Sequence, residues 1–135
     1  MKSILVAVDK VDLFWPFVAD DISKCLTDTN ADCCAADLYI MCRQGAAFLH
    51  LITDEEKIKA VMVWRAETWP SAIVLKNLVT VGKGMTRWLP VAIQSANELA
   101  RLCGATKFRW QGRPEWARVF RKAKVTAVSY EMDVE

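Results

Sequence analysis

The chain has 135 residues, of which 53% are hydrophobic and 25% charged, and its formal net charge is +2. This length and apolar content exclude a disordered chain and fit one globular domain with its own core. No apolar run approaches the roughly eighteen residues of a membrane span, and the N-terminus does not resemble a signal peptide, so we expect a cytoplasmic protein without a membrane partner.

Charge is divided unevenly along the chain. Residues 1–60 carry six Lys and Arg against ten Asp and Glu, whereas residues 61–135 carry twelve against six. This division predicts a basic surface on the C-terminal half.

The five cysteines and the single histidine form no catalytic or metal-binding pattern. No Cys-x-x-Cys pair is present, and the spacing of the cysteines around His50 does not match zinc ribbons or fingers. We therefore expect free thiols, a structural histidine and no metal.

The first half of the chain predicts a strand, two helices and a hairpin. Residues 2–8 form a short run rich in Ile and Val, which is typical of a strand. Apolar side chains then recur at the spacing of one helix, with Pro16 in its first turn: Phe14, Phe17, Val18, Ile22 and Leu26. A shorter helix is predicted through residues 35–42, and two β-type runs, 46–52 and 58–66, flank a charged turn and predict a hairpin.

The second half predicts three further strands and two helices. Residues 72–81 continue the hairpin as a meander, and residues 85–103 form an amphipathic helix ended by Gly104. Residues 106–110 predict a strand, a short helix follows the Gly112-Arg113-Pro114 sequence, and residues 125–132 alternate as a last strand.

These elements predict a single α+β domain over residues 1–135, in the order β-α-α-β-β-β-α-β-α-β. We expect one mixed, mostly antiparallel sheet of about six strands, flanked by about four helices.

The Gly82-Lys83-Gly84 turn joins a predicted strand to the longest predicted helix. Glycines at this place let the helix N-terminus present bare backbone N–H groups to an anion, which is the chemistry of phosphate sites. The alternative is a plain turn that needs glycine only for its backbone geometry.

This element order, together with residues 81–86 and 112–120, resembles the GNAT superfamily of acyl-CoA N-acyltransferases. The second stretch, with residues 101–105 before it, is similar to short GNAT-like proteins encoded by bacteriophages. The resemblance implies that the glycine turn holds the pyrophosphate of acetyl-CoA. The cofactor-binding candidates are then Val81, Gly82, Lys83, Gly84, Met85, Thr86 and Arg87.

The family pattern of this turn is Gln or Arg, any, any, Gly, any, Gly or Ala. The chain keeps the middle glycine as Gly84 but has Val81 and Thr86 at the two ends, so its pyrophosphate loop is degenerate. The family also often uses a tyrosine on the last short helix to protonate the leaving thiolate, and this chain has Phe120 or Arg121 near that position, neither of which can act as a tyrosine would. Glu67 is the candidate for the base that takes a proton from the amine, as the only acidic residue between Lys59 and Glu98.

Two functions follow from the resemblance. The first is an N-acetyltransferase that moves an acyl group from acyl-CoA to an amine substrate. The second is a catalytically inactive phage protein that acts by contact, as a virion component or as a binder of a host protein, in the bacterial cytoplasm or in the virion. Nucleic-acid binding ranks last, because the basic C-terminal half carries no recognised nucleic-acid motif. The pattern defines neither the amine nor the oligomeric state.

Overall fold

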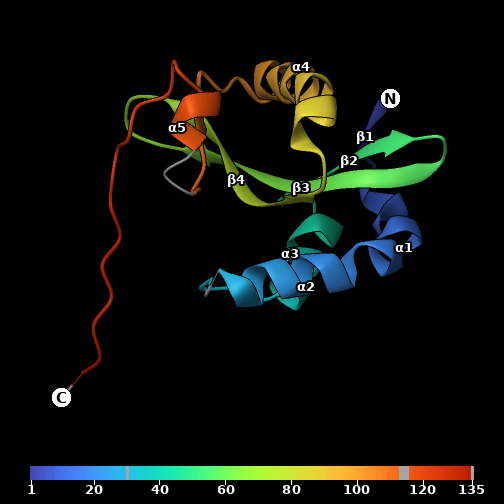
Figure 1. The fold of residues 1–135 in the computed structure, drawn as a ribbon, viewed down its shortest axis with the longest axis horizontal. Helices are drawn as coiled ribbons and strands as arrows, with labels where there is room; N and C mark the ends of the chain where they lie inside the picture. Colours follow the sequence, from blue (N-terminus) through green and yellow to red (C-terminus); the bar gives the residue numbers. More distant parts are fainter. Residues whose placement is uncertain (30, 113–115, 135) are drawn as a thin grey trace.

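A twisted sheet between two layers of helices forms the centre of the protein (Figure 1). The computed structural model describes residues 1–29, 31–112 and 116–134. Within these residues the sheet has five strands in the spatial order β1-β2-β3-β4-β5, antiparallel except for the parallel pair of β4 and β5. The strands are β1 (Lys2–Val6), β2 (Phe48–Asp54), β3 (Lys57–Thr68), β4 (Ile73–Gly82) and β5 (Lys107–Arg109).

The helices cover both faces of this sheet. Figure 1 shows α1, α2 and α3 on one face and α4 on the other, with α5 beside β4 and β5. They are α1 (Val11–Phe14), α2 (Ala19–Asp28), α3 (Ala35–Arg43), α4 (Met85–Cys103) and α5 (Trp116–Val119), with 3-10 turns η1 (Val8–Lys10) and η2 (Trp15–Phe17). No helix in the described part of the chain is long and apolar enough to span a membrane.

Each face of the sheet has its own apolar core, because successive side chains of a strand point to opposite faces. In β3, Val61 and Val63 pack toward α1–α3, whereas Met62 and Trp64 pack toward α4. The core under α1–α3 also contains Ile22, Leu26, Leu38, Leu49, Leu51 and Val79. The core under α4 also contains Ile52, Leu75, Trp88, Ala92, Ala96 and Leu99.

The predicted α+β class and the mostly antiparallel sheet are confirmed. The helix predicted over residues 85–103 has the same bounds in the structure, and the hairpin of β2 and β3 closes at Glu55 and Glu56, whose φ angles are +50° and +65°. Such paired positive φ values fit the tight turns that match strand twist.

The single helix predicted through residues 14–26 is wrong. The chain forms α1, passes through η2 at Pro16 and begins again at Ala19 as α2. Proline has no N–H to donate and its ring crowds the preceding turn, which explains why the helix is interrupted at Pro16.

The last predicted strand, residues 125–132, is also wrong, so the sheet has five strands in place of about six. The described residues 120–134 contain no strand, and Tyr130 and Met132 are 92% and 91% exposed. Figure 1 shows this tail running away from the body of the domain. An alternating sequence forms a strand only where the edge of another strand can pair with it. Strand β5 offers an edge of three residues, which is too short for such pairing.

Deleting the tail, residues 125–135, is expected to change the free energy of unfolding by less than about 0.5 kcal/mol, as for exposed surface positions in general. Its apolar side chains lie open to solvent, with Val125 81% and Val128 67% exposed. Urea denaturation of the full and shortened chains measures the difference. A loss of several kcal/mol would mean that the tail pairs with the sheet in solution.

Candidate functional site

Strands β4 and β5 separate soon after they meet. Their pairing covers three positions, from Val74 with Lys107 to Lys76 with Arg109. On the other edge of β4, Val79 lies opposite Val63 and Asn77 opposite Trp64, so Leu78 is an extra residue. Such a β-bulge bends its strand and increases the local twist. Among the described residues, β4 therefore has no strand partner on its β5 side from Asn77 onward.

Two side chains support this bulge from within β4. Asn77 donates from Nδ2 to the carbonyl oxygen of Val79 at 3.2 Å, and Thr80 donates from Oγ1 to Asn77 Oδ1 at 2.9 Å. Both residues also line an apolar cavity under α4. The hydrogen bonds thus hold the polar part of the cavity wall in place.

An apolar cavity of about 180 Å³ lies where β4 and β5 diverge, under α4. Ala92 and Ala96 of α4 leave room for it, because their side chains are short. Six aromatic residues from β3, α4, β5, α5 and the adjoining loops line it: Trp64, Trp88, Phe108, Trp110, Trp116 and Phe120. The rings of Trp110 and Phe120 lie 5.0 Å apart between centroids, a distance typical of aromatic pairs.

The predicted glycine turn lies at one end of this cavity. Gly82 ends β4, and Gly84 begins α4 with φ at +68° and no side-chain cap on the helix. Trp88 joins the turn to the cavity, since it lines the cavity and donates from Nε1 to the carbonyl oxygen of Lys83 at 3.1 Å. Met85 lines the same cavity.

The other predicted cofactor-binding residues lie around this turn. Val81 packs toward the α1–α3 core, while Lys83, Thr86 and Arg87 are exposed. A Cβ atom on Gly84 would meet nothing within 4 Å among the described residues, so the approach to this backbone is open. The first N–H groups of an uncapped helix and two nearby cations favour an anion here.

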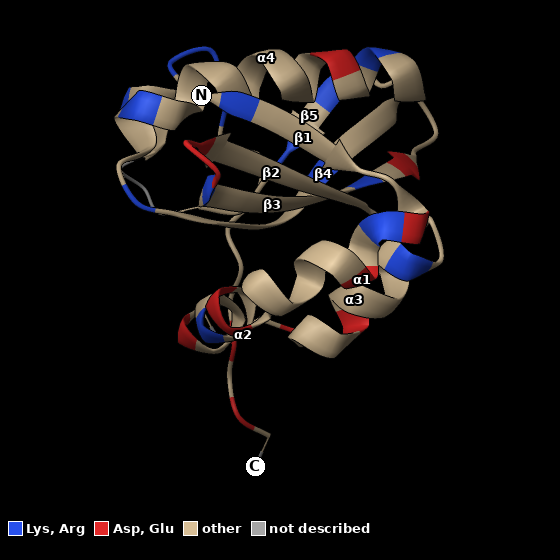
Figure 2. Ribbon diagram, turned by 90° about the vertical axis from the view of Figure 1, so that its right-hand side faces the viewer, with Lys and Arg blue, Asp and Glu red and all other residues tan. Residues whose placement is uncertain are grey.

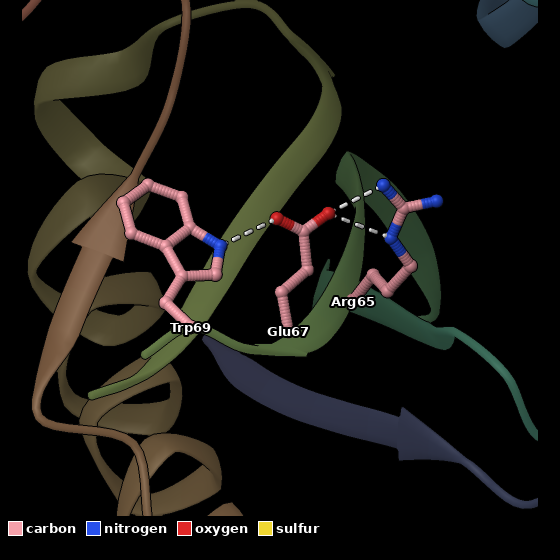
Figure 3. Close-up of polar contacts among 3 residues, drawn as sticks. All are labelled: Arg65, Glu67 and Trp69. Carbon is pink, nitrogen blue, oxygen red and sulfur yellow. Dashed lines mark hydrogen bonds and ion pairs between the residues drawn. The ribbon is translucent and has the colours of Figure 1, made fainter. Parts of the chain in front are cut away.

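Glu67, the predicted base, lies on the opposite face of the sheet from the cavity. Arg65 donates from Nε to its carboxylate at 3.0 Å, and Trp69 donates from Nε1 at 3.2 Å (Figure 3). The hydrogen bond from Arg65 is the main cause that lowers the pKa of Glu67. The structure does not bring Glu67 to the cavity wall, whose residues alternate with it along β3.

His50 is a fully buried part of the scaffold behind the cavity. Its Nδ1 accepts a hydrogen bond from Trp64 Nε1 at 3.2 Å, and an indole N–H can only donate. The proton of the neutral ring is therefore on Nε2, which donates to Ser3 Oγ at 2.8 Å, and Ser3 in turn donates to Ser95 at 2.6 Å. Burial lowers the pKa of His50 to about 4.

Trp88, which closely follows the glycine turn in the sequence, lines the cavity. The sequence pattern did not predict the aromatic wall that β5 and α5 contribute. The short helix α5 begins at Trp116, and Trp116 and Phe120 are partly buried, while Val119 and Ala123 are exposed. The one available signal was the number of tryptophans, six in 135 residues.

Two further expectations concern the cysteines and the basic surface of the C-terminal half. In the part of the chain that the structure describes, no three His, Cys, Asp or Glu side chains gather as metal ligands. In the described residues none of the five cysteines forms a disulfide, and Cys42 is buried with its pKa raised to about 11 by desolvation. Arg113, one of the cations behind the basic surface predicted on the C-terminal half, lies outside the described residues.

No known family profile matches the chain, and no curated protein matches it in sequence. Solved structures match its fold over nearly the whole length. A probable acetyltransferase is 14% identical, with a TM-score of 0.68 over 100% of this chain and 99% of the other. The ribosomal-protein-alanine N-acetyltransferase of Brucella melitensis biovar Abortus 2308 is 13% identical, with a TM-score of 0.64 over 99% and 100%. An aminoglycoside acetyltransferase from an uncultured soil metagenomic sample, in complex with sisomicin, is 12% identical, with a TM-score of 0.67 over 99% and 96%.

Proposed function

We propose that the protein is a GNAT-type N-acyltransferase that moves an acyl group from acyl-CoA to an amine. The fold is that of GNAT-type acetyltransferases. At identities of 12% to 14% the similarity supports the fold and not the activity. The observation that supports the activity is the separation of β4 from β5 beyond the Lys76 and Arg109 pair. At this place an apolar cavity lies beside the N-terminus of α4, which has no side-chain cap.

The residues present fit acetyl-CoA in three places. The backbone of residues 81–87, with the charges of Lys83 and Arg87, would hold the pyrophosphate at the open approach to Gly84. The unpaired edge of β4 would hold the amide-bearing arm, and the cavity would enclose its apolar end. Because Val81 and Thr86 replace the family's polar and small residues, we expect weak binding.

When bound, acyl-CoA supplies an acyl group activated as a thioester. In the transfer a bond forms between the amine nitrogen and the acyl carbon, and the C–S bond breaks. The nitrogen loses one proton, and the leaving thiolate takes up one proton to be released as the thiol. The aromatic wall keeps water away from the acyl group and so favours the amine over hydrolysis. In this proposal Glu67 positions Arg65, because its lowered pKa makes it a weak base.

Filling the cavity is the direct test. Asn97→Trp places a large ring where the side chain lines the cavity, and it should abolish the heat of acetyl-CoA binding in calorimetry and the rise in Tm. Bound ligand at a hundred times its Kd should stabilise the unmodified protein by about 2.7 kcal/mol. Leu102→Trp is the matched control on the same helix, since Leu102 is 82% exposed and outside the cavity. No heat and no shift at millimolar acetyl-CoA would contradict the proposal.

We propose as the second candidate a GNAT-like phage protein that acts by contact, in the virion or on a host protein. The exposed apolar side chains of the tail favour it, since Val128, Tyr130 and Met132 are open to solvent. Its test is the composition of purified virions, in which the protein should be present in stoichiometric amount. Turnover by a monomer that is absent from virions would contradict it.

A further inference from the structure

Three cations lie side by side across β3, β4 and β5. Arg65 is the register partner of Lys76, and Lys76 is the register partner of Arg109. Neighbours in register point to the same face of a sheet, so the three side chains form one row. We call Arg65, Lys76 and Arg109 the cation row, and Figure 2 marks lysine and arginine positions on these strands in blue.

The cation row lies on the back of the cavity wall. Trp64, Asn77 and Phe108 each precede or follow one of its members in the chain, and all three line the cavity on the α4 face. Successive side chains alternate between faces, so the row points to the other face. Lys76 and Arg109 are also the last pair that joins β4 to β5. The row therefore stands where the two strands part, opposite the cavity.

Neighbouring side chains hold the outer members of the row in place. Glu67 forms an ion pair with Arg65, and the guanidinium carbon of Arg109 lies 4.5 Å above the ring of Trp69. Trp69 in turn donates to Glu67 (Figure 3). One connected set of contacts therefore joins both arginines. Two immobilised guanidinium groups on either side of Lys76 lose little conformational entropy when they bind an anion.

Positive charge is in excess around the row. Lys107 lies on the same face of the sheet, because its register partner Val74 is two residues before Lys76 in β4. On β3 the one carboxylate beside these four cations is Glu67, which Arg65 already engages. Lys76 also acts on the Glu67 carboxylate, as a smaller cause of its lowered pKa than Arg65, so this one carboxylate is shared by two of the four cations. Arg65 keeps 37% of its side chain exposed.

We propose that the cation row binds an oxyanion, a carboxylate or a phosphate, on the amine that accepts the acyl group. The inference rests on the proposed function, in which acyl-CoA occupies the α4 side and leaves the opposite face to the acceptor. Guanidinium groups match the two oxygens of such an anion in a bidentate geometry. A polycationic amine, such as an aminoglycoside, meets like charge at this place and is disfavoured.

The binding test compares O-phosphoethanolamine with ethanolamine, which share the amine and differ in the phosphate. Titration of the full chain followed by nitrogen-proton correlation spectra should shift the amides of Lys76 and Arg109 with the first probe only. Lys76→Glu should weaken that binding about tenfold or more, as expected for lost charge-assisted contacts. Arg109→Gln should weaken it with less disturbance of the fold, and Lys57→Glu, an exposed position on β3, is the matched control.

The transfer assay with acetyl-CoA separates the two proposals. A kcat/KM at least about tenfold higher for O-phosphoethanolamine, lost in Lys76→Glu and kept in Lys57→Glu, supports the inference. Phosphate binding at the row in a protein that gives no heat with millimolar acetyl-CoA supports the oxyanion site and overturns the proposed function. Equal turnover of both amines, unchanged by Lys76→Glu, overturns the oxyanion site and leaves acyl transfer standing.

Discussion

Replacing His50 by leucine is expected to lower the free energy of unfolding by about 3 kcal/mol at pH 7, and by much less at pH 4. The imidazole is fully buried and bonds on both nitrogens, to Trp64 and to Ser3. Leucine fills most of the volume but leaves the buried indole N–H without a partner, while Ser3 loses one hydrogen bond and keeps its bond to Ser95. A buried group left unsatisfied costs about 1 to 3 kcal/mol, and a lost hydrogen bond about 0.5 to 1.5 kcal/mol.

The pH dependence follows from the direction of the pKa shift. Burial lowers the pKa of His50 from its ordinary value of 6.5 to about 4. Between these values the unfolded chain binds a proton at His50 and the folded chain does not, so stability falls as the pH falls through this window. The slope is about 1.4 kcal/mol per pH unit for one group, or about 3 kcal/mol over the window.

Urea denaturation of both proteins at pH 7, 5.5 and 4 measures this effect. The wild-type protein should lose its advantage over His50→Leu as the pH falls, because the variant has no imidazole to protonate. His50→Gln is the control that keeps hydrogen-bonding capacity without the titration. A constant difference between wild type and His50→Leu at all three pH values would show that the pKa of His50 is the same in the folded and the unfolded protein.

Local signals predicted the parts of the fold that local interactions determine. Helix α4 was predicted to the residue, because its apolar spacing is regular and glycines with φ of +68° and +72° stand at its two ends. The tail shows the opposite case. Its alternation from Val128 to Val134 is as regular as in a strand, but pairing depends on an edge elsewhere in the chain, and β5 provides three residues.

The candidate site was predictable only at its glycine turn. The cavity depends on the bulge at Leu78 and on where β4 and β5 stop pairing, and both are properties of register between distant segments. The same holds for the cation row, whose members are separated in sequence and meet only through strand pairing. Sequence reasoning placed Glu67 near its strand end but had no signal for Arg65 as its ion-pair partner.

The two glycines of the turn are expected to differ in the reason they are needed. Gly84 has a positive φ and open space around it, so Gly84→Ala should cost about 1 kcal/mol from backbone strain alone. A Cβ on Gly82 would lie 2.9 Å from both the Ala60 Cβ and the Lys59 carbonyl oxygen, and 3.1 Å from the Trp88 ring. Because the backbone of Lys59 cannot move away easily, Gly82→Ala should lower the free energy of unfolding by about 2 kcal/mol, in the range of overpacked cores.

The Gly82 substitution should also reach the site, because Trp88 is both a wall of the cavity and the donor to the Lys83 carbonyl. Displacing its ring should weaken acetyl-CoA binding in Gly82→Ala, measured by calorimetry on protein shown by circular dichroism to be folded. In Gly84→Ala the ring stays in place, and a loss of affinity there would arise at the open backbone itself. If Gly84→Ala were the more destabilising variant, the positive φ of the turn would matter more than the contact of Gly82 with Trp88.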